Sequence, residues 1–469
     1  MSETPLDSDL SRSLSRRQMT MLGLGSAIGT GLFLGAGSSI SVAGPAVILS
    51  YLAGAVLAAI VAIALAEMTS ALPVRGSFGA IVGRFLGPLA GFAVRWTYWF
   101  SLVVGIGSEV VAAAIYLNFW WPQVPIWLSV AVFSLLLTLV NLTHVRFFGM
   151  AESVFAGIKV LAISVFILLG LVLVLFGLPG RPATGFGNLV SHGGFLPNGP
   201  SAVWLVMSIV VVAFAGIEVV AVSAPEARQP REALRSATRS VITRLSLFYL
   251  LSIVLMLAIR PWTELSRVHG LDGSPFVATF ASADIPAAAT VTNFVLIVTA
   301  LSAANANLYA AARMLHSLAH DGFAPRRLSR ANRHGLPWTA TLASTVGLLV
   351  AAILAAYAGR ATFGILLATG GFGIIATWIT ILVTLLVFRR KGPAPGSSIR
   401  LPGGPVLPVL GVLALLSVFA TGIAVPDMRL ACFVGVPFVL TVTAVYALFV
   451  RRRVSPAAGE SDTSLVDSA

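Results

Sequence analysis

Three ionisable residues of this chain lie inside long apolar stretches, where a charge is costly. They are Glu109 in "GIGSEVVAAAIY", Lys159 in "VFAGIKVLAIS" and Glu218 in "VVAFAGIEVV". Burial in an apolar medium disfavours the charged form of such groups, so they can take up and release a proton. The three positions therefore predict proton-coupled chemistry within the apolar part of the protein.

Each of the three also has a simpler structural interpretation. Lys159 lies about eight residues, or roughly 12 Å, into its stretch, too deep for its amine to reach the nearby interface easily. The alternative to proton coupling is a permanently charged lysine that caps carbonyls of the first apolar stretch. Glu109 could line a substrate cavity, meet a substrate ammonium or carry a proton, or it could be a protonated carboxyl bonded to a neighbouring helix. Glu218 could bond nearby backbone groups or share in the coupling.

Polar and aromatic residues add further candidates. Ser302, Asn305 and Tyr309 have the spacing i, i+3 and i+7, which puts them on one face of a helix. Asn305 is a candidate for substrate contact, and the alternative for all three is ordinary hydrogen bonding between helices. Phe214 could close over a substrate as an aromatic gate, or it could only fill space.

Other polar residues predict structural roles. Glu67 and Glu152 lie near the ends of apolar stretches, and we expect them to anchor loops. His316 and His320 have the i, i+4 spacing of metal ligands, but no third ligand is evident. The sequence therefore predicts no metal site, no cofactor and no catalytic residue.

Composition identifies the elements that must position these residues. The 469 residues are 57% hydrophobic and 10% charged, whereas a soluble domain has about 25% charged residues. Apolar stretches recur at about the 20 residues that a bilayer-crossing helix needs, and this excludes a β-barrel, whose strands alternate over about 10 residues. We expect an all-α membrane protein with twelve spans: 19–41, 43–66, 92–118, 126–143, 151–178, 201–223, 241–259, 285–312, 337–358, 361–388, 404–424 and 429–450.

The net charge of +13 is explained by its placement. With both termini on the cytoplasmic side, 24 of the 30 Lys and Arg residues fall on that side and five fall outside. This split follows the positive-inside rule and favours contact with anionic lipid over nucleic-acid binding. The basic stretch between spans six and seven, residues 225–244, predicts a short helix on the inner membrane surface.

Spans one and six carry small residues where a membrane helix should be continuous. Span one contains "SAIGTG" and span six contains "AFAGIE", and each would open one half of a five-plus-five inverted repeat. An interrupted helix frees N–H groups for a carboxylate and carbonyls for an ammonium, which together suit a zwitterionic amino acid. The alternative for the glycines of span one is close helix packing. A nucleotide fingerprint is excluded, because the spacing is G-x-G-x-x-x-G and no strand precedes it.

At these residues the chain resembles bacterial amino acid permeases of the amino acid–polyamine–organocation superfamily, in its proton-coupled amino acid transporter branch. The resemblance is carried in order by "LSRRQMTMLGLGSAIGTGLFLGAG", "ALAEMTSALPVRGSF", "FLGPLAGFAVRWTYWF", "AGIKVLAI", "AFAGIEVVAVSAPEARQP" and "SAANANLYAAARMLHSLAHDGFAPRRL". It implies a leucine-transporter-like fold with ten core helices, helices 1 and 6 broken, and two extra helices.

The resemblance also implies roles for individual residues. The substrate carboxylate would bind the span-one backbone and its ammonium the span-six carbonyls, with Glu109 as the acid of span three. Lys159 would stand where sodium-coupled relatives hold an ion, with Ser302 as its neighbour. The substrate-binding backbone comprises Ser26, Ala27, Ile28, Gly29, Thr30, Gly31, Phe214, Ala215, Gly216 and Ile217, and the coupling residues are Lys159, Glu218 and Ser302.

Two positions depart from the family's pattern. The family commonly has G-E-x-E-F before span five, where this chain has "GMAES" with Met150 at the first acid. This weakens a role for the acid at that end of the span. Ala215 stands where a second glycine or a hydroxyl residue is common, so the pocket's choice of substrate is not fixed by the resemblance.

These observations predict an organisation and a function. We expect cytoplasmic tails at 1–18 and 451–469, a transport core at 19–388 with repeats at about 19–178 and 201–388, a cytoplasmic linker at 389–403, and spans 11–12 at 404–450. The expected function is proton-coupled import of a neutral L-amino acid, aliphatic or aromatic, across the bacterial inner membrane by alternating access. The alternative is an exchanger of amino acids or polyamines. A membrane enzyme is disfavoured because no nucleophile–base pair is evident, and a sensor is disfavoured because the tails are short.

Overall fold

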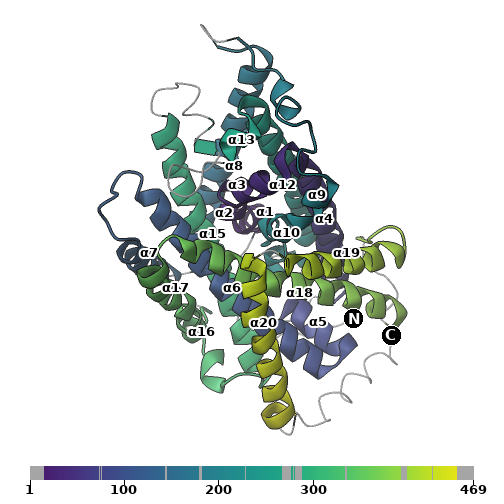
Figure 1. The fold of residues 1–469 in the computed structure, drawn as a ribbon. Helices are drawn as coiled ribbons and strands as arrows, with labels where there is room; N and C mark the ends of the chain where they lie inside the picture. Colours follow the sequence, from purple (N-terminus) through teal and green to yellow (C-terminus); the bar gives the residue numbers. More distant parts are fainter. Residues whose placement is uncertain are drawn as a thin grey trace.

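The computed structural model describes residues 15–72, 74, 76–142, 145–178, 182–227, 229–266, 276–277, 279, 288–332, 335–391, 399–424 and 426–451. Within these ranges every regular element is a helix, and none is a strand (Figure 1). The expectation of an all-α membrane protein is confirmed at this level.

Helix occupies each of the twelve expected spans within the described ranges. Spans one and six are made of several short helices, whereas most of the others are long. The helices are α1 Arg16–Ala27, α2 Thr30–Phe33, α3 Gly35–Ala43, α4 Val47–Ala71, α5 Ser77–Leu86, α6 Pro88–Leu117, α7 Ile126–Asn141, α8 Val145–Leu175, α9 Pro200–Leu205, α10 Met207–Ala213, α11 Val219–Ser223, α12 Pro230–Ile259, α13 Trp262–Leu265, α15 Ala288–His320, α16 Trp338–Ser344, α17 Val346–Ala358, α18 Ala361–Lys391, α19 Val406–Gly422 and α20 Pro426–Val445.

Eight helical segments in the described part of the chain are long and apolar enough to cross a membrane. Four more are apolar but shorter, namely α5, α7, the α9–α10 pair and α19. Length and composition therefore support eight membrane crossings in the described part of the chain, and the twelve-span arrangement remains a prediction.

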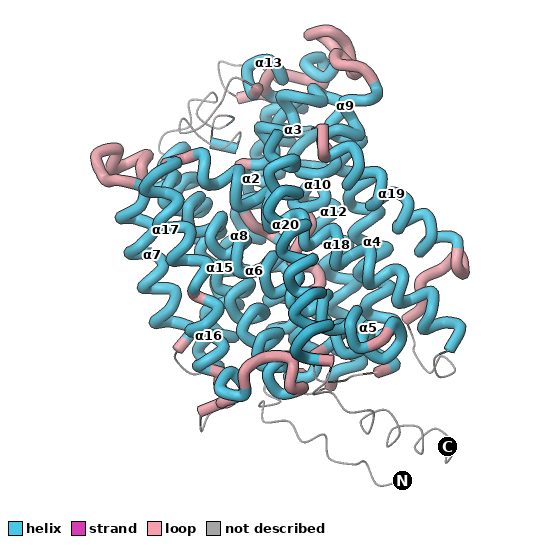
Figure 2. The backbone as a smooth tube through the Cα atoms, turned by 60° about the horizontal axis from the view of Figure 1, so that its bottom comes forward, coloured by secondary structure: helices cyan, strands magenta, loops and turns pink. Residues whose placement is uncertain are grey.

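The helices form a bundle around α6, which packs against both α15 and α18. The short helices α5 and α13 lie at opposite ends of this bundle (Figure 2). α6 contains many small residues along its length, which lets its neighbours approach closely. For example, a Cβ on Gly347 of α17 would collide with the backbone of Val103 in α6.

Two elements differ from their expected limits. In the described part of the basic stretch at 225–244, the expected separate surface helix is replaced by the first turns of α12, which runs without interruption from Pro230 to Ile259. α15 continues to His320 rather than ending near residue 312. One of its added turns carries Arg313, whose guanidinium pairs with Glu226 at 2.8 Å in a buried position. That buried pair holds the extended end of α15 in place.

Both expected helix interruptions are present. α1 ends at Ala27, Ile28 and Gly29 have non-helical backbone angles, and α2 begins at Thr30. α10 ends at Ala213, five residues form turns, and α11 begins at Val219. Gly216 lies in this second interruption with φ at +97°, a conformation that favours glycine.

Candidate functional site

A cavity lies where the two interruptions meet. α6, α15 and α18 complete its walls. Seven of the predicted substrate-binding residues line it, and so does Glu218 of the predicted coupling residues. The seven are Ser26, Ala27, Gly29, Gly31, Glu109, Ala215 and Gly216. The sequence thus identified the central part of the cavity.

The two interruptions touch each other. A Cβ placed on Gly216 would lie 2.7 Å from the backbone carbonyl carbon and oxygen of Ser26, which is closer than real side chains allow. A Cβ on Gly31 would lie 2.9 Å from the Cα of Ala213. Glycine is therefore required at both positions for contact, and at Gly216 for its positive φ as well. Helix packing and cavity formation coexist here.

Glu109 reaches the start of α2 from α6. Both of its carboxylate oxygens lie 3.2 Å from the backbone nitrogen of Thr30, which donates to them. Gly29 leaves room for this approach, because a Cβ there would collide with the carboxylate. Glu109 therefore lines the cavity, as a substrate-site acid would, and also accepts a hydrogen bond from a neighbouring helix, as in the simpler structural interpretation.

Glu218 bonds backbone that its own interruption has freed. Its Oε2 accepts from the N–H of Gly216 at 3.2 Å. Its Oε1 has no hydrogen-bond partner among the described residues and is buried. This bond agrees with the structural interpretation of Glu218, in which the side chain satisfies freed backbone, while a role in coupling remains a proposal.

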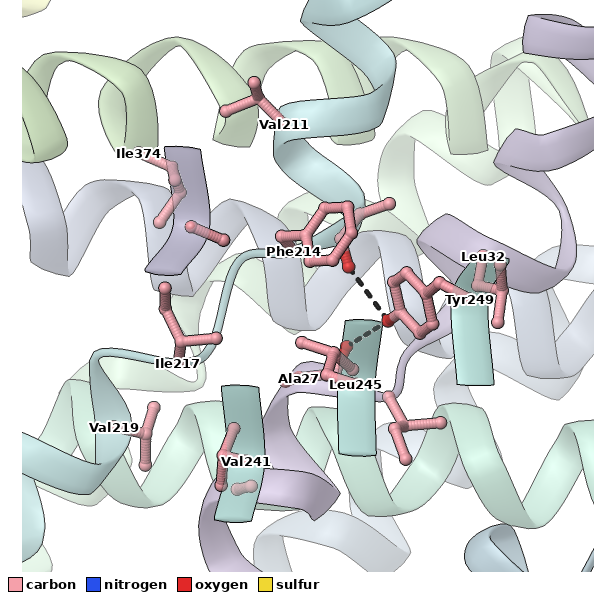
Figure 3. Packing of buried hydrophobic residues seen from close by; sticks show 14 of the residues in the cluster. Ala27, Leu32, Val211, Phe214, Ile217, Val219, Val241, Leu245, Tyr249 and Ile374 are labelled. Carbon is pink, nitrogen blue, oxygen red and sulfur yellow. Dashed lines mark hydrogen bonds between the residues drawn. The ribbon is translucent and has the colours of Figure 1, made fainter. Parts of the chain in front are cut away.

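Tyr249 of α12 was not identified from the sequence. Its hydroxyl lies 2.8 Å from the carbonyl oxygen of Ala27 and 3.0 Å from that of Ala213, the last residues of α1 and α10 (Figure 3). One hydroxyl thus contacts a carbonyl at each interruption, and the Ala27 carbonyl also accepts from the backbone N–H of Gly29 at 3.0 Å. A tyrosine in an apolar helix gives no sequence signal of its own, and only the pairing of the two breaks could have suggested a donor there.

Phe214 packs rather than facing the cavity. Its ring centroid lies 4.9 Å from that of Tyr249 and 6.3 Å from that of Tyr51, and its side chain is 1% exposed. Ile28 and Ile217 are also buried and do not line the cavity, and Thr30 takes part through its backbone. The packing interpretation of Phe214 matches this arrangement.

Lys159 bonds the first half of span one. Its Nζ donates to the carbonyl oxygen of Gly25 at 2.5 Å, and its side chain is fully buried. The Lys159 charge is attracted by Glu152 of its own helix and by Glu109. This geometry matches the carbonyl-capping alternative and does not by itself decide about a proton.

The expectation that Glu152 anchors a loop is wrong. Glu152 is 1% exposed, its Oε1 accepts from Ser302 Oγ at 2.8 Å, and its Oε2 accepts from Asn305 Nδ2 at 3.2 Å. A Cβ on Gly25 would collide with the same carboxylate. Because α8 begins at Val145, before the expected start at 151, Glu152 lies inside the bundle instead of at its edge.

Asn305 lies away from the cavity. It donates to Glu152 and accepts from Asn141 Nδ2 of α7 at 2.7 Å, so Ser302 and Asn305 make the interhelical bonds of the simpler interpretation. Asn307 lies about 200° further round α15. It lines the cavity and accepts from Ser26 Oγ at 3.0 Å. The i, i+3, i+7 pattern of Ser302, Asn305 and Tyr309 does not include Asn307, so that pattern provided no indication of its role.

Glu67 does anchor a loop, as expected. It forms hydrogen bonds of 2.8 and 2.7 Å with Arg389 and accepts from the backbone N–H of Leu401 at 2.8 Å. Within the described ranges no three His, Cys, Asp or Glu residues come together in a way that could hold a metal ion.

Comparison with known proteins agrees with this architecture. A sequence model of the amino acid permease family matches residues 18–457. The chain is similar to the amino-acid permease RocC of Bacillus subtilis, at 36% identity over 95% of this chain and 96% of the relative. It is also similar to the gamma-aminobutyric acid permease of Bacillus subtilis, at 34% over 96% and 95%, and to the aromatic amino acid transport protein AroP of Escherichia coli, at 35% over 94% and 96%. The chain is therefore a membrane-spanning transporter rather than an enzyme, and it belongs to the amino acid permease family.

Proposed function

We propose that this permease imports a neutral L-amino acid together with a proton and binds its substrate in the cavity between the two interruptions. The observation that carries this is the lining of the cavity. Among the described residues that line it, the ionisable ones are Glu109 and Glu218, and none is basic. A substrate carboxylate would therefore bind backbone N–H groups, and a cationic side chain would find both acids already bonded to backbone N–H groups.

The proposed pose follows from the free backbone groups. The carboxylate binds the N–H groups around Gly29–Gly31, where Glu109 now accepts from Thr30. The ammonium binds the carbonyls around 214–217. The side chain extends toward Gly105 of α6 and Gly370 of α18, where small residues leave room. The relatives are named for different amino acids, which is consistent with a pocket whose specificity lies in a few side chains.

Proton coupling in this proposal depends on Lys159. An ammonium donates a stronger hydrogen bond than a neutral amine does, so protonation tightens the hold of α8 on the Gly25 carbonyl. Gly25 lies two residues before Ala27, which lines the cavity. Glu152 positions Lys159 by attracting its charge from the same helix. The protonation state of Lys159 is thereby linked to the shape of the substrate cavity.

The orientation and organisation belong to the same proposal. Both termini lie in the cytoplasm of a bacterium, and residues 19–388 form the transport core with two inverted repeats. An exchanger of amino acids or polyamines is the second candidate, because every feature of the cavity would serve exchange equally well.

Uptake by purified protein in vesicles tests the proposal. A labelled amino acid is offered with an imposed inward proton gradient, and the twenty amino acids compete in turn. Accumulation that follows the gradient and is inhibited by neutral amino acids supports proton symport. Uptake that ignores the gradient but requires internal substrate would replace symport with exchange.

A further inference from the structure

A groove with a positive lining lies between the start of α1 and the first turns of α12, away from the substrate cavity. It contains about 1260 Å³ of open space. Arg16 forms its wall on α1, and Arg235, Arg239 and Arg244 form its wall on α12. The hydroxyl side chains of Ser236, Ser240 and Thr243 line it as well.

The charge of the groove is not balanced by its own residues. Glu232 is its one acidic lining residue in the described part of the chain, and it pairs with Arg16 at 2.7 Å. Arg235, Arg239 and Arg244 form no ion pair with any described residue. The Thr243 hydroxyl donates to the Arg239 carbonyl oxygen at 2.9 Å, which leaves the hydroxyls of Ser236 and Ser240. Three guanidinium groups with these two serines between them suit a phosphate, because guanidinium donates to phosphate oxygens in a paired geometry.

The groove ends where the lipid-facing surface begins. α12 is polar and basic as far as Arg244 and apolar from Leu245 onward. Ser236, Ser240, Thr243 and Leu247 follow i, i+4, i+7 and i+11, so one helix face runs from the groove to an apolar side chain that is 53% exposed. α8 packs against α12 and exposes Val154 and Leu161. A ligand with a phosphate and an apolar tail would contact both regions.

We propose that this groove binds the phosphate headgroup of an anionic phospholipid, with the acyl chains on the exposed apolar surface of α12 and α8. The bound headgroup bridges Arg16 of α1 and the arginines of α12. Ala27, at the other end of α1, lines the substrate cavity. Anionic lipid therefore ties the inner half of span one to span seven and affects transport without touching the substrate.

The acidic residues of the N-terminal segment are the competing occupant. Glu3, Asp7 and Asp9 precede Arg16 in the chain. A polar peptide would satisfy the arginines but would leave the apolar surface beyond Thr243 unused. The lipid accounts for both parts of the surface, and a chain lacking residues 2–14 separates the two possibilities.

The test compares the full-length protein with the double variant Arg235→Gln/Arg239→Gln. The control is Arg326→Gln/Arg327→Gln, which removes two exposed arginines outside the groove. Phosphatidylglycerol, phosphatidylcholine and inorganic phosphate are added to detergent-purified protein, and lipid binding is measured by native mass spectrometry and by the midpoint of thermal unfolding. One basic residue near an anionic surface contributes about fivefold to affinity, so the groove variant should bind phosphatidylglycerol about 30-fold more weakly.

Five results support or overturn the proposal. Phosphatidylglycerol should stabilise the wild type, the control and the truncated chain, and uptake in vesicles of phosphatidylcholine alone should be equal for the groove variant and the wild type. Equal phosphatidylglycerol affinity in the groove variant and the control would overturn the proposal. Full stabilisation by inorganic phosphate would show that no lipid is needed. Stabilisation by lipid only after truncation would assign the groove to the N-terminal segment.

Discussion

The Glu109 carboxylate of α6 accepts a hydrogen bond from the backbone N–H of Thr30, the first residue of α2. A carboxylate of the protein thus occupies the site at which the proposed substrate carboxylate binds. In the proposed pose, substrate and Glu109 compete for the same N–H group, and a displaced Glu109 would be free to face the substrate ammonium. The acid would then exchange a backbone partner for a ligand during each transport cycle.

Replacing Glu109 by Gln tests this exchange. The amide keeps an acceptor oxygen but loses the charge, and charge-assisted hydrogen bonds are about twice as strong as neutral ones. The amide competes less strongly for the Thr30 N–H, but it no longer attracts the substrate ammonium by charge. We expect the second effect to be the larger one and the dissociation constant of the transported amino acid to rise about tenfold, which corresponds to ~1.4 kcal/mol. Isothermal titration on purified protein measures it. An unchanged constant would remove Glu109 from the substrate site.

Replacing Lys159 by Ala tests the coupling. The variant loses the group that holds Gly25, and we expect it to lose gradient-driven accumulation while it retains substrate binding and some exchange. Accumulation in vesicles is measured from about pH 5 to pH 8, with counterflow of labelled substrate as the control for a folded protein. If accumulation persists over that whole range, Lys159 serves only to cap the carbonyl.

Replacing Glu152 by Gln separates its charge from its hydrogen bonds. The glutamine oxygen can still accept from Asn305, and its amide nitrogen can donate to the Ser302 hydroxyl in place of the bond that Ser302 now donates. Glutamine no longer favours the ammonium form of Lys159 through a negative charge. We expect half-maximal uptake to move to more acidic pH with little change in substrate affinity. A uniform loss of uptake at every pH would instead indicate a structural role for Glu152.

Replacing Gly216 by Ala tests the contact between the two interruptions. The added methyl group meets the Ser26 backbone at 2.7 Å, and φ is +97°, so we expect transport to be abolished. The matched control is Gly157→Ala in α8, where no atom lies within 4 Å of the added Cβ. Initial uptake rates, normalised to protein in the vesicles, compare the two. Normal uptake by the Gly216 variant would contradict the geometry.

Replacing Tyr249 by Phe removes the donor shared by the Ala27 and Ala213 carbonyls. The Ala27 carbonyl keeps the Gly29 N–H as a donor, so the loss falls mainly on the Ala213 carbonyl, and a buried acceptor without a partner costs about 1–3 kcal/mol. We expect a lower unfolding temperature in detergent and a smaller stabilisation by substrate, because both interruptions lose a common support. If the variant unfolds at the wild-type temperature, water or another group already satisfies these carbonyls.

The sequence predicted those features that depend on residue type. Glycines and small residues located both interruptions, and the apolar lengths located helix in every expected span. Lys159, Glu109 and Glu218 were identified because an ionisable group in an apolar stretch is rare. The direction in which each side chain points was harder to infer, and Phe214 packs against tyrosines although it adjoins the interruption.

The missed features depend on the rotation and length of helices. Asn305 and Asn307 differ by two positions, but they lie on nearly opposite faces of α15, and one faces Glu152 while the other faces the cavity. Glu152 was placed at the edge of the bundle because the start of α8 was set six residues late. Helix limits and facing directions are fixed by tertiary packing, which single-chain patterns do not contain.

The partner of Lys159 is a main-chain carbonyl of Gly25, and every amino acid possesses such a group. No point mutation at residue 25 can delete it, and no compensating side chain can evolve to replace it. In a genetic screen for loss of transport, hits are therefore expected at Lys159 itself but not as losses of its acceptor. Substitutions at residue 25 would act differently, because an added Cβ collides with the Glu152 carboxylate while the carbonyl itself is kept.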